Sequence, residues 1–307
     1  MRVLVTGAAG QLGWHTTAHL HKAGFDVVAT DVLYRADCPV RLQMADLLDR
    51  HAAYKLLEGC DALVHLGNHA NQHAIEPWQR LYTENVTMNM NVIQAALDMG
   101  IRRIVFASSI QAACSRRYML FPLEEDPPKS PVACLPFDTA TPTQPGNHYA
   151  LSKEASEKML DLWAFQHPGR SFTSIRYPTL IHTNLPRYHR HYGAEGWPLF
   201  LDEAFSYLTF DDAADLIETL LHTSRPGHTV VMPSANDNRL NLTAAELIKL
   251  LYRGVPLKKT FSPDARTVFD LGELKALYNW SPKLTVPHHQ LPPELHKLIQ
   301  AKINAPE

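Results

Sequence analysis

A glycine-rich turn near the N-terminus constrains this chain more than any other feature of its sequence. The apolar run Arg2–Thr6 predicts a strand, and the pattern of Gln11–Ala23 predicts a helix. Gly7, Gly10 and Gly13 span the junction between them. A strand, a turn with this glycine spacing and a helix form the phosphate-binding unit of Rossmann-type dinucleotide folds. The sequence therefore predicts such a unit at the start of the chain.

Each glycine has a physical purpose in such a unit. Gly7 permits the tight turn, Gly10 lets the backbone approach a pyrophosphate, and Gly13 permits close packing of the helix on the strand. Gln11 and Leu12 begin the helix, where unpaired amides and the helix dipole attract phosphates. We therefore expect all five residues to contact a dinucleotide.

The end of the second predicted strand, 26–31, indicates which dinucleotide binds. Asp31 lies 18 residues after Gly13, at the end of that strand. A carboxylate there accepts hydrogen bonds from the adenosine ribose hydroxyls and repels the 2′-phosphate of NADP. NAD is therefore the predicted cofactor. Arg35 lies close by and keeps NADP open as an alternative, because a guanidinium can receive a 2′-phosphate.

The first half of the chain alternates apolar runs with helical patterns. Such alternation predicts βαβ units, and right-handed crossovers then give a doubly wound parallel sheet. The predicted fold class is therefore α/β, with a Rossmann-type doubly wound parallel sheet. Further strands are predicted at 62–66, 104–108 and 173–177, and helices at 78–99 and 149–165.

The pattern becomes less regular after Tyr177. We expect residues 1–177 to form the NAD-binding domain and residues 178–307 a small substrate-binding lobe, with some segments returning to the core sheet. In that lobe, Thr243 with Glu246 predicts a capping box at a helix start. A helix is also predicted at 211–223 and a strand at 229–232, and the tail from position 287 is polar and interrupted by proline. In the first half, the high proline content of 121–147 predicts a long ordered loop.

Composition excludes several classes of protein. The formal net charge is -2, which argues against a nucleic-acid surface. No apolar run approaches the roughly 18 residues of a membrane span, and the first residues lack the pattern of a signal peptide, so a cytoplasmic protein is expected. The cysteines form no C-x-x-C pair and are expected to be free thiols. No zinc-ligand spacing occurs, so no metal is expected.

Tyr149 and Lys153 open a predicted helix four positions apart, so both project from one face. A phenol is a poor base at neutral pH, but a nearby ammonium and an oxidised nicotinamide ring both favour the phenolate. Tyr149 can then take a proton from a substrate hydroxyl. An interfacial tyrosine beside a solvated lysine is the alternative, which the glycine-rich turn upstream disfavours.

Ser108 and Ser109 end a predicted strand, and the carboxyl ends of strands face the ligand crevice in such sheets. A hydroxyl there can hydrogen-bond the reacting oxygen, or it can simply cap the strand end.

With these residues identified, the chain resembles the extended short-chain dehydrogenase/reductases of the NAD-dependent epimerase/dehydratase group over nearly its whole length. Ser109, Tyr149 and Lys153 match the catalytic Ser/Thr-Tyr-Lys set of that family. The resemblance implies that Lys153 also binds the nicotinamide ribose and that Ser109 positions the reacting oxygen.

The same resemblance implies further cofactor-binding residues. Asp46 and Leu47 resemble the pair that holds the adenine. Leu66 and Gly67 resemble the strand end that flanks the cofactor ribose. Asn85 resembles the family asparagine that orders the central helix and the active-site loop.

Several stretches resemble uronate dehydrogenases in particular: TGAAGQLG at 6–13, FASS at 106–109 and SAND at 234–237. Those enzymes oxidise the anomeric carbon of a hexuronic acid to a lactone and reduce NAD. The resemblance implies that Arg176 grips the substrate carboxylate and that Gln11 lies near the sugar. An arginine held in a salt bridge near the strand end is the alternative for Arg176.

The chain departs from that pattern around the sugar. Ile110 and Gln111 occupy the positions at which the family has an Asn-His pair. Ala70, which follows Asn68 and His69, occupies the position of a family serine in the sugar pocket. We expect Asn68, His69 and Ile110, together with the catalytic serine, to contact the substrate. The changed polar contacts alter which sugar is recognised. The stretch 184–197, rich in Tyr, His and Arg, is an insertion relative to the family.

The expected function is therefore NAD-dependent oxidation of a hydroxyl of a free sugar or sugar acid, with Tyr149 as general base. A nucleotide-sugar 4-epimerase with tightly bound NAD is the alternative, although Tyr177 and Asp211 are only 34 positions apart, which is short for a nucleotide lobe. A non-catalytic NAD-binding regulator is a third alternative. Because family members often dimerise through helices like 78–99 and 149–165, a homodimer is expected as well.

Overall fold

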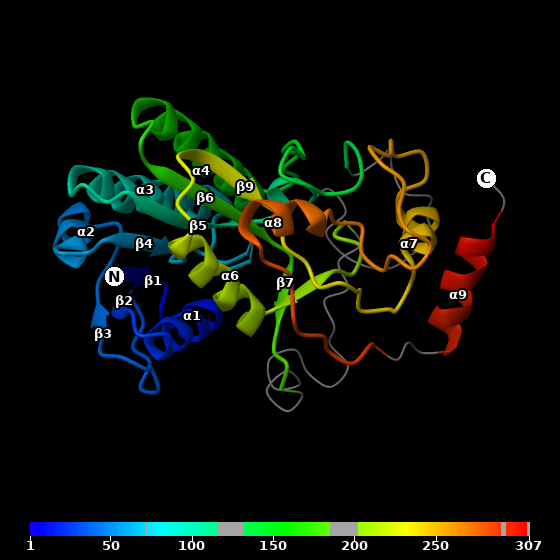
Figure 1. Ribbon diagram of the computed structural model, residues 1–307, viewed down its shortest axis with the longest axis horizontal. Helices are drawn as coiled ribbons and strands as arrows, with labels where there is room; N and C mark the ends of the chain where they lie inside the picture. The colour runs from blue at the N-terminus through cyan, green and yellow to red at the C-terminus, as the bar shows by residue number, and fades with distance from the viewer. Residues whose placement is uncertain (72, 116–131, 185–201, 290–292, 306–307) are drawn as a thin grey trace.

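The computed structural model describes residues 1–71, 73–115, 132–184, 202–289 and 293–305, and it has the predicted α/β architecture (Figure 1). Seven parallel strands form the central sheet in the order β3-β2-β1-β4-β5-β6-β9. The chain order reverses between β1 and β4, which creates the switch point where such sheets bind ligands. The strands are β1 (Arg2–Thr6), β2 (Asp26–Asp31), β3 (Leu42–Met44), β4 (Ala62–His65), β5 (Arg103–Ser109), β6 (Ser171–Tyr177) and β9 (Gly227–Val231).

Helices cover both faces of this sheet (Figure 1). On one face α1 (Gln11–Lys22) packs beside α6 (Phe210–His222), over alternate strand residues such as Val5. Leu4 points to the opposite face, because successive side chains of a strand alternate. The helices of that face are α2 (Arg50–Leu57), α3 (Trp78–Asp98) and α4 (His148–Gln166).

Local sequence signals explain where the main helices begin and end. Gly24 and Gly100, just beyond α1 and α3, have φ angles of 88° and 82°, a left-handed conformation that glycine adopts without strain. Asn147 caps α4, since its side chain accepts a hydrogen bond from the Ala150 amide. This cap fixes the first turn of α4, which carries Tyr149.

The second half of the chain adds a smaller lobe and also completes the core. One hydrophobic cluster joins side chains of α7 and α9 to Ile110 and Phe137 of the first half, whereas β9 joins the central sheet beside β6 and α6 packs on α1. The predicted capping box at Thr243 is confirmed. The division at Tyr177 stays a prediction. The added elements are β7 (Thr179–Ile181), β8 (Tyr207–Thr209), α7 (Ala244–Leu251), α8 (Leu271–Tyr278) and α9 (Pro293–Asn304).

Several elements were not predicted. β3 and α2 are short, and α9 forms in the polar tail after Pro293, which sits at its first position, where proline fits a helix. Of the proline-dense stretch only 132–147 is described, and its backbone bridges to the second lobe at Leu135–Leu257 and Phe137–Phe269. The insertion 184–197 lies outside the described residues apart from Asn184. Within the described ranges, no helix has the length and apolarity that a membrane span requires.

Candidate active site

A cavity of about 940 Å³ opens at the carboxyl ends of the central strands, at the β1–β4 switch point. Most of the predicted site residues line it, from the glycine-rich turn to the helix α4. The exceptions are Asp46, Asn85 and Arg176. The predicted residues on its wall are Gly7, Gly10, Gln11, Leu12, Gly13, Asp31, Leu47, Leu66, Gly67, Asn68, His69, Ser109, Ile110, Tyr149 and Lys153.

The glycine-rich turn has the geometry that its spacing predicts. Gly7 has a φ angle of 68°, and a Cβ there would lie 2.8 Å from the Gly67 nitrogen. A Cβ on Gly13 would lie 2.0 Å from the Gly7 carbonyl oxygen, so only glycine allows α1 to pack this close. A Cβ on Gly10 would lie 3.2 Å from that oxygen and would crowd the cradle at the helix N-terminus. The turn therefore fits the diphosphate of a dinucleotide.

Asp31 lies at the ribose end of this cradle. Its carboxylate accepts hydrogen bonds from the amides of Ala9 and Leu33, both at 3.0 Å, and it lines the cavity. Arg35 lies against the same turn: its guanidinium donates to the Asp37 carboxylate at 2.7 Å and to the Ala9 and Gly10 carbonyls at 3.0 and 3.3 Å. It also lies 5.1 Å from the ring centre of Trp14. Both the carboxylate of Asp31 and the guanidinium of Arg35 therefore lie beside the glycine-rich turn.

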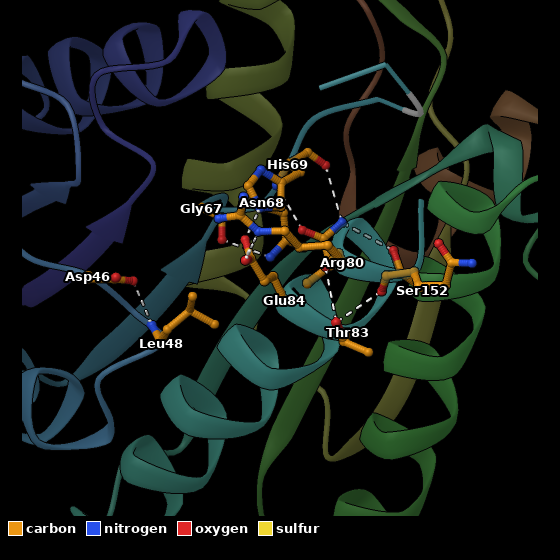
Figure 2. A network of polar contacts seen from close by, with 11 residues as sticks. Asp46, Leu48, Gly67, Asn68, His69, Arg80, Thr83, Glu84 and Ser152 are labelled. Atoms are coloured by element: carbon orange, nitrogen blue, oxygen red, sulfur yellow. Dashed lines mark hydrogen bonds and ion pairs between the residues drawn. The ribbon is translucent and has the colours of Figure 1, made fainter. Parts of the chain in front are cut away.

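The two residues predicted to hold the adenine, Asp46 and Leu47, lie differently with respect to the cavity. Leu47 lines the cavity, but Asp46 does not; its carboxylate accepts a hydrogen bond from the Leu48 amide at 2.9 Å, a contact drawn in Figure 2. Asn91 donates to the Leu47 carbonyl from α3 at 3.0 Å. Asp46 thus supports the turn that carries Leu47, and its contact with an adenine stays a prediction.

The predicted catalytic residues converge on the cavity. Tyr149 and Lys153 lie one turn apart on α4, with the Lys153 Nζ 5.6 Å from the Tyr149 ring centre. Burial lowers the pKa of Lys153 to about 7, an effect that the nearby Glu157 carboxylate opposes. Ser109 is the last residue of β5, and its hydroxyl oxygen accepts a hydrogen bond from the Gln111 amide at 3.2 Å. Its hydroxyl hydrogen is therefore available to another oxygen.

The loop after β4 is held from behind by α3. Asn85 is fully buried; its side chain accepts from the His69 amide at 2.8 Å and donates to the Ser152 hydroxyl at 3.2 Å. Asn85 therefore ties this loop to α4 instead of touching the cavity. The His69 ring pairs with Glu84 at 2.7 Å, and Arg80 pairs with the same carboxylate (Figure 2). Hydrogen bonds from Arg80 and His69 lower the pKa of Glu84.

The structure overturns the prediction for Arg176. Its guanidinium makes a bidentate ion pair with Glu157 of α4, at 2.9 and 2.6 Å, and its third nitrogen donates to the Thr141 carbonyl at 2.7 Å. Both side chains of the pair are about 5% exposed or less, and Arg176 does not line the cavity. The neighbouring Tyr177 does, because alternation along β6 turns the two side chains to opposite faces. Arg176 is thus the salt-bridged arginine of the alternative reading.

The sequence pattern missed a second acidic part of the wall. Asp202 and Glu203 line the cavity, both 3% exposed, although no motif marks them. Glu203 accepts hydrogen bonds from the Thr179 amide, at 3.0 Å, and from its hydroxyl. Burial raises the pKa of Glu203 to about 8. The described residues contain no group of three His, Cys, Asp or Glu side chains placed to hold a metal ion.

Comparison with known proteins places this site in context. The model of the NAD dependent epimerase/dehydratase family matches residues 3–204. The uronate dehydrogenase of Pseudomonas putida is 30% identical over 241 residues, which are 78% of this chain and 77% of that protein. The UDP-glucose 4-epimerase of Lactobacillus helveticus is 30% identical over 185 residues, which are 58% of this chain and 51% of that protein.

Solved structures share the fold. Uronate dehydrogenase from Agrobacterium tumefaciens in complex with NAD matches with a TM-score of 0.62 at 22% identity, over 100% of this chain and 91% of that one. UDP-glucose 4-epimerase from Bifidobacterium longum in complex with NAD+ and UDP matches with a TM-score of 0.65 at 17% identity, over 93% of this chain and 94% of that one. At these identities the likeness establishes the Rossmann-type architecture.

Proposed function

Because the chain belongs to the NAD dependent epimerase/dehydratase family, we propose that it is an NAD-dependent dehydrogenase that oxidises a hydroxyl of a free sugar or sugar acid. One observation carries the proposal: Ser109, Tyr149 and Lys153 meet on one cavity wall, while the glycine-rich turn and Asp31 lie on the same cavity. NAD bound there would supply the hydride acceptor.

Side chains of the protein remove the proton of the substrate hydroxyl. Tyr149, as phenolate, takes the proton of the substrate hydroxyl, and the Lys153 ammonium stabilises that phenolate. Because the Ser109 oxygen already accepts the Gln111 amide, the Ser109 hydroxyl donates its hydrogen to the reacting oxygen and orients it. Removing the Tyr149 hydroxyl leaves no group in this set able to take the proton.

Two considerations support a dehydrogenase over an epimerase. The uronate dehydrogenases match over three quarters of their length, whereas the Lactobacillus helveticus epimerase matches over 51% of its length. The chain between Tyr177 and Asp211 is also short for a lobe that holds a nucleotide. A nucleotide-sugar epimerase remains the second candidate, because epimerases occur among both the relatives and the structural neighbours.

The test is NADH formation by the full chain with NAD and a panel of free aldoses and hexuronic acids, run in parallel with NADP. We expect absorbance to rise with at least one sugar, and Tyr149→Phe to lower kcat by about 100-fold or more. Near-normal turnover of Tyr149→Phe would contradict the proposed base.

The same samples separate the alternatives. If no panel sugar reduces NAD, interconversion of UDP-glucose and UDP-galactose, followed by NMR without net NADH, would identify an epimerase. NAD binding without turnover in either assay would favour the non-catalytic regulator.

A further inference from the structure

A continuous chain of hydrogen bonds connects the dinucleotide turn to Lys153. The Thr6 hydroxyl meets His65 Nδ1 at 2.7 Å, His65 Nε2 meets Asn89 Oδ1 at 2.8 Å, and Asn68 Nδ2 meets the same oxygen at 2.7 Å. Lys153 Nζ then donates to Asn68 Oδ1 at 2.7 Å. Asn68 lies in the cavity wall, and the other residues of this chain of hydrogen bonds are almost fully buried. The orientations of their side chains are therefore fixed by bonds to other protein groups and not by solvent.

The direction of the first bonds follows from donor and acceptor counting. The Thr6 hydroxyl oxygen accepts the amides of Leu66 and Gly67, both at 3.0 Å, which uses its two lone pairs. Its hydrogen must therefore go to His65 Nδ1. The ring then carries its own proton on Nε2 and donates it to Asn89. Burial keeps the ring neutral, lowering the pKa of His65 to about 4.

The same counting fixes both amides. Asn89 Oδ1 accepts from His65, so Asn89 must present its oxygen there, while its nitrogen donates to the Ser156 hydroxyl at 2.7 Å. Asn68 must then present its nitrogen to Asn89 and to the Gly67 carbonyl, at 2.7 Å each. Consequently the Asn68 oxygen can face only Lys153. A flipped Asn68 would set its oxygen against two acceptors and its nitrogen against the Lys153 ammonium, a donor.

Lys153 is held by neutral acceptors. Besides Asn68, its Nζ donates to the Ala107 carbonyl at 2.8 Å, which leaves one of its three hydrogens for other partners. The titratable groups around it are Tyr149 and Glu157 of α4 and the neutral His65 of β4. Glu157 is engaged by Arg176, and among the described residues the acceptors of Lys153 are the Asn68 oxygen and the Ala107 carbonyl.

We propose that Asn68 is a positioning residue for proton transfer: its amide oxygen, oriented by Asn89 and His65, holds the Lys153 ammonium beside Tyr149. This inference rests on the proposed dehydrogenase function and assigns Asn68 a role other than the substrate contact expected from its sequence position. Because the amide is neutral, a charged or an apolar group at this position changes the electrostatic surroundings of Lys153 in opposite directions.

The test replaces the amide by a charged and by an apolar group. Asn68→Asp puts a carboxylate against Lys153 and should move the basic limb of the kcat–pH profile upward by about one unit or more. Asn68→Leu removes the acceptor and should move the same limb downward. Asn89→Leu, which acts from behind the cavity wall, should shift it in the same direction as Asn68→Leu but less far.

A second readout does not need turnover. NADH affinity of the full chain is measured by fluorescence across pH, because loss of the Lys153 charge weakens binding of an anionic cofactor. The midpoint should move up in Asn68→Asp and down in Asn68→Leu, and Lys153→Met should abolish the transition. If wild type oxidises no sugar but these opposite shifts occur, the proposed function fails and the positioning role stands.

Other outcomes overturn the inference. Should both Asn68 variants shift the midpoint in one direction, or leave it unmoved while activity falls, Asn68 is only structural. A raised sugar KM with unchanged pH midpoints would instead make Asn68 a direct substrate contact.

Discussion

Replacing Arg176 by methionine distinguishes a structural arginine from a substrate ligand. In the structure the guanidinium satisfies both oxygens of Glu157 and the Thr141 carbonyl, in a region with almost no solvent access. Methionine fills a similar volume but leaves Glu157 buried with only the Ser108 hydroxyl as a described hydrogen-bond donor, at 2.6 Å. The substitution therefore strands a carboxylate in the core.

The expected cost is large because the desolvated charge loses its partner. Breaking a buried ion pair from one side costs about 3–5 kcal/mol, which corresponds to a fall in Tm of roughly 5–8 °C for a chain of this size. Adding Glu157→Gln to Arg176→Met removes the stranded charge and should recover about 2 kcal/mol or more, since a neutral replacement of both partners is tolerated.

Urea unfolding followed by fluorescence measures these differences. Arg102→Met is the matched control, because Arg102 is exposed and its loss should change stability by about 0.5 kcal/mol or less. The reasoning is refuted if Arg176→Met keeps the wild-type unfolding midpoint while its KM rises for hexuronic acids but not for neutral sugars. That result would restore Arg176 as the carboxylate ligand.

Two further predictions follow from the cavity wall. Gly13→Ala should lower NADH affinity by about tenfold or more, about 1.4 kcal/mol, because the added methyl group meets the Gly7 carbonyl. Gly169→Ala is the control, because a Cβ at Gly169 has no atom within 4 Å and should leave the affinity unchanged. Equal affinities of the two variants would contradict the packing argument. Glu203 has its folded-state pKa raised to about 8, so folding keeps it protonated and wild type loses stability as pH rises from about 4.5 to 8, by about 3 kcal/mol at pH 7. Glu203→Gln keeps the contact with Thr179 without this loss, so its stability relative to wild type should increase between pH 5 and pH 8; parallel stability–pH curves would show that Glu203 is ionised in the folded protein.

Much of the fold could be predicted from local sequence. The glycine-rich turn, the strand that ends at Asp31 and the Tyr149–Lys153 helix follow from short spacings, and each spacing fixes a geometry within one or two turns of chain. The parallel sheet followed from the alternation of such segments. Short elements such as β3 and α2 were missed because three or eight residues carry little periodicity.

The glycine-rich turn, the placement of Tyr149 and Lys153 on one helix face and the class of sheet could be read from the sequence, because they depend on contacts between near neighbours or on backbone conformations that glycine adopts without strain. Which side chains face the cavity required the folded structure. Arg176 turned to Glu157, Asn68 turned to Lys153, and Glu203 entered the wall from a segment with no motif. Each of these contacts joins residues that are 19 or more positions apart in the chain. Because a buried polar group without a hydrogen-bond partner is costly, these distant partners decide where each side chain points.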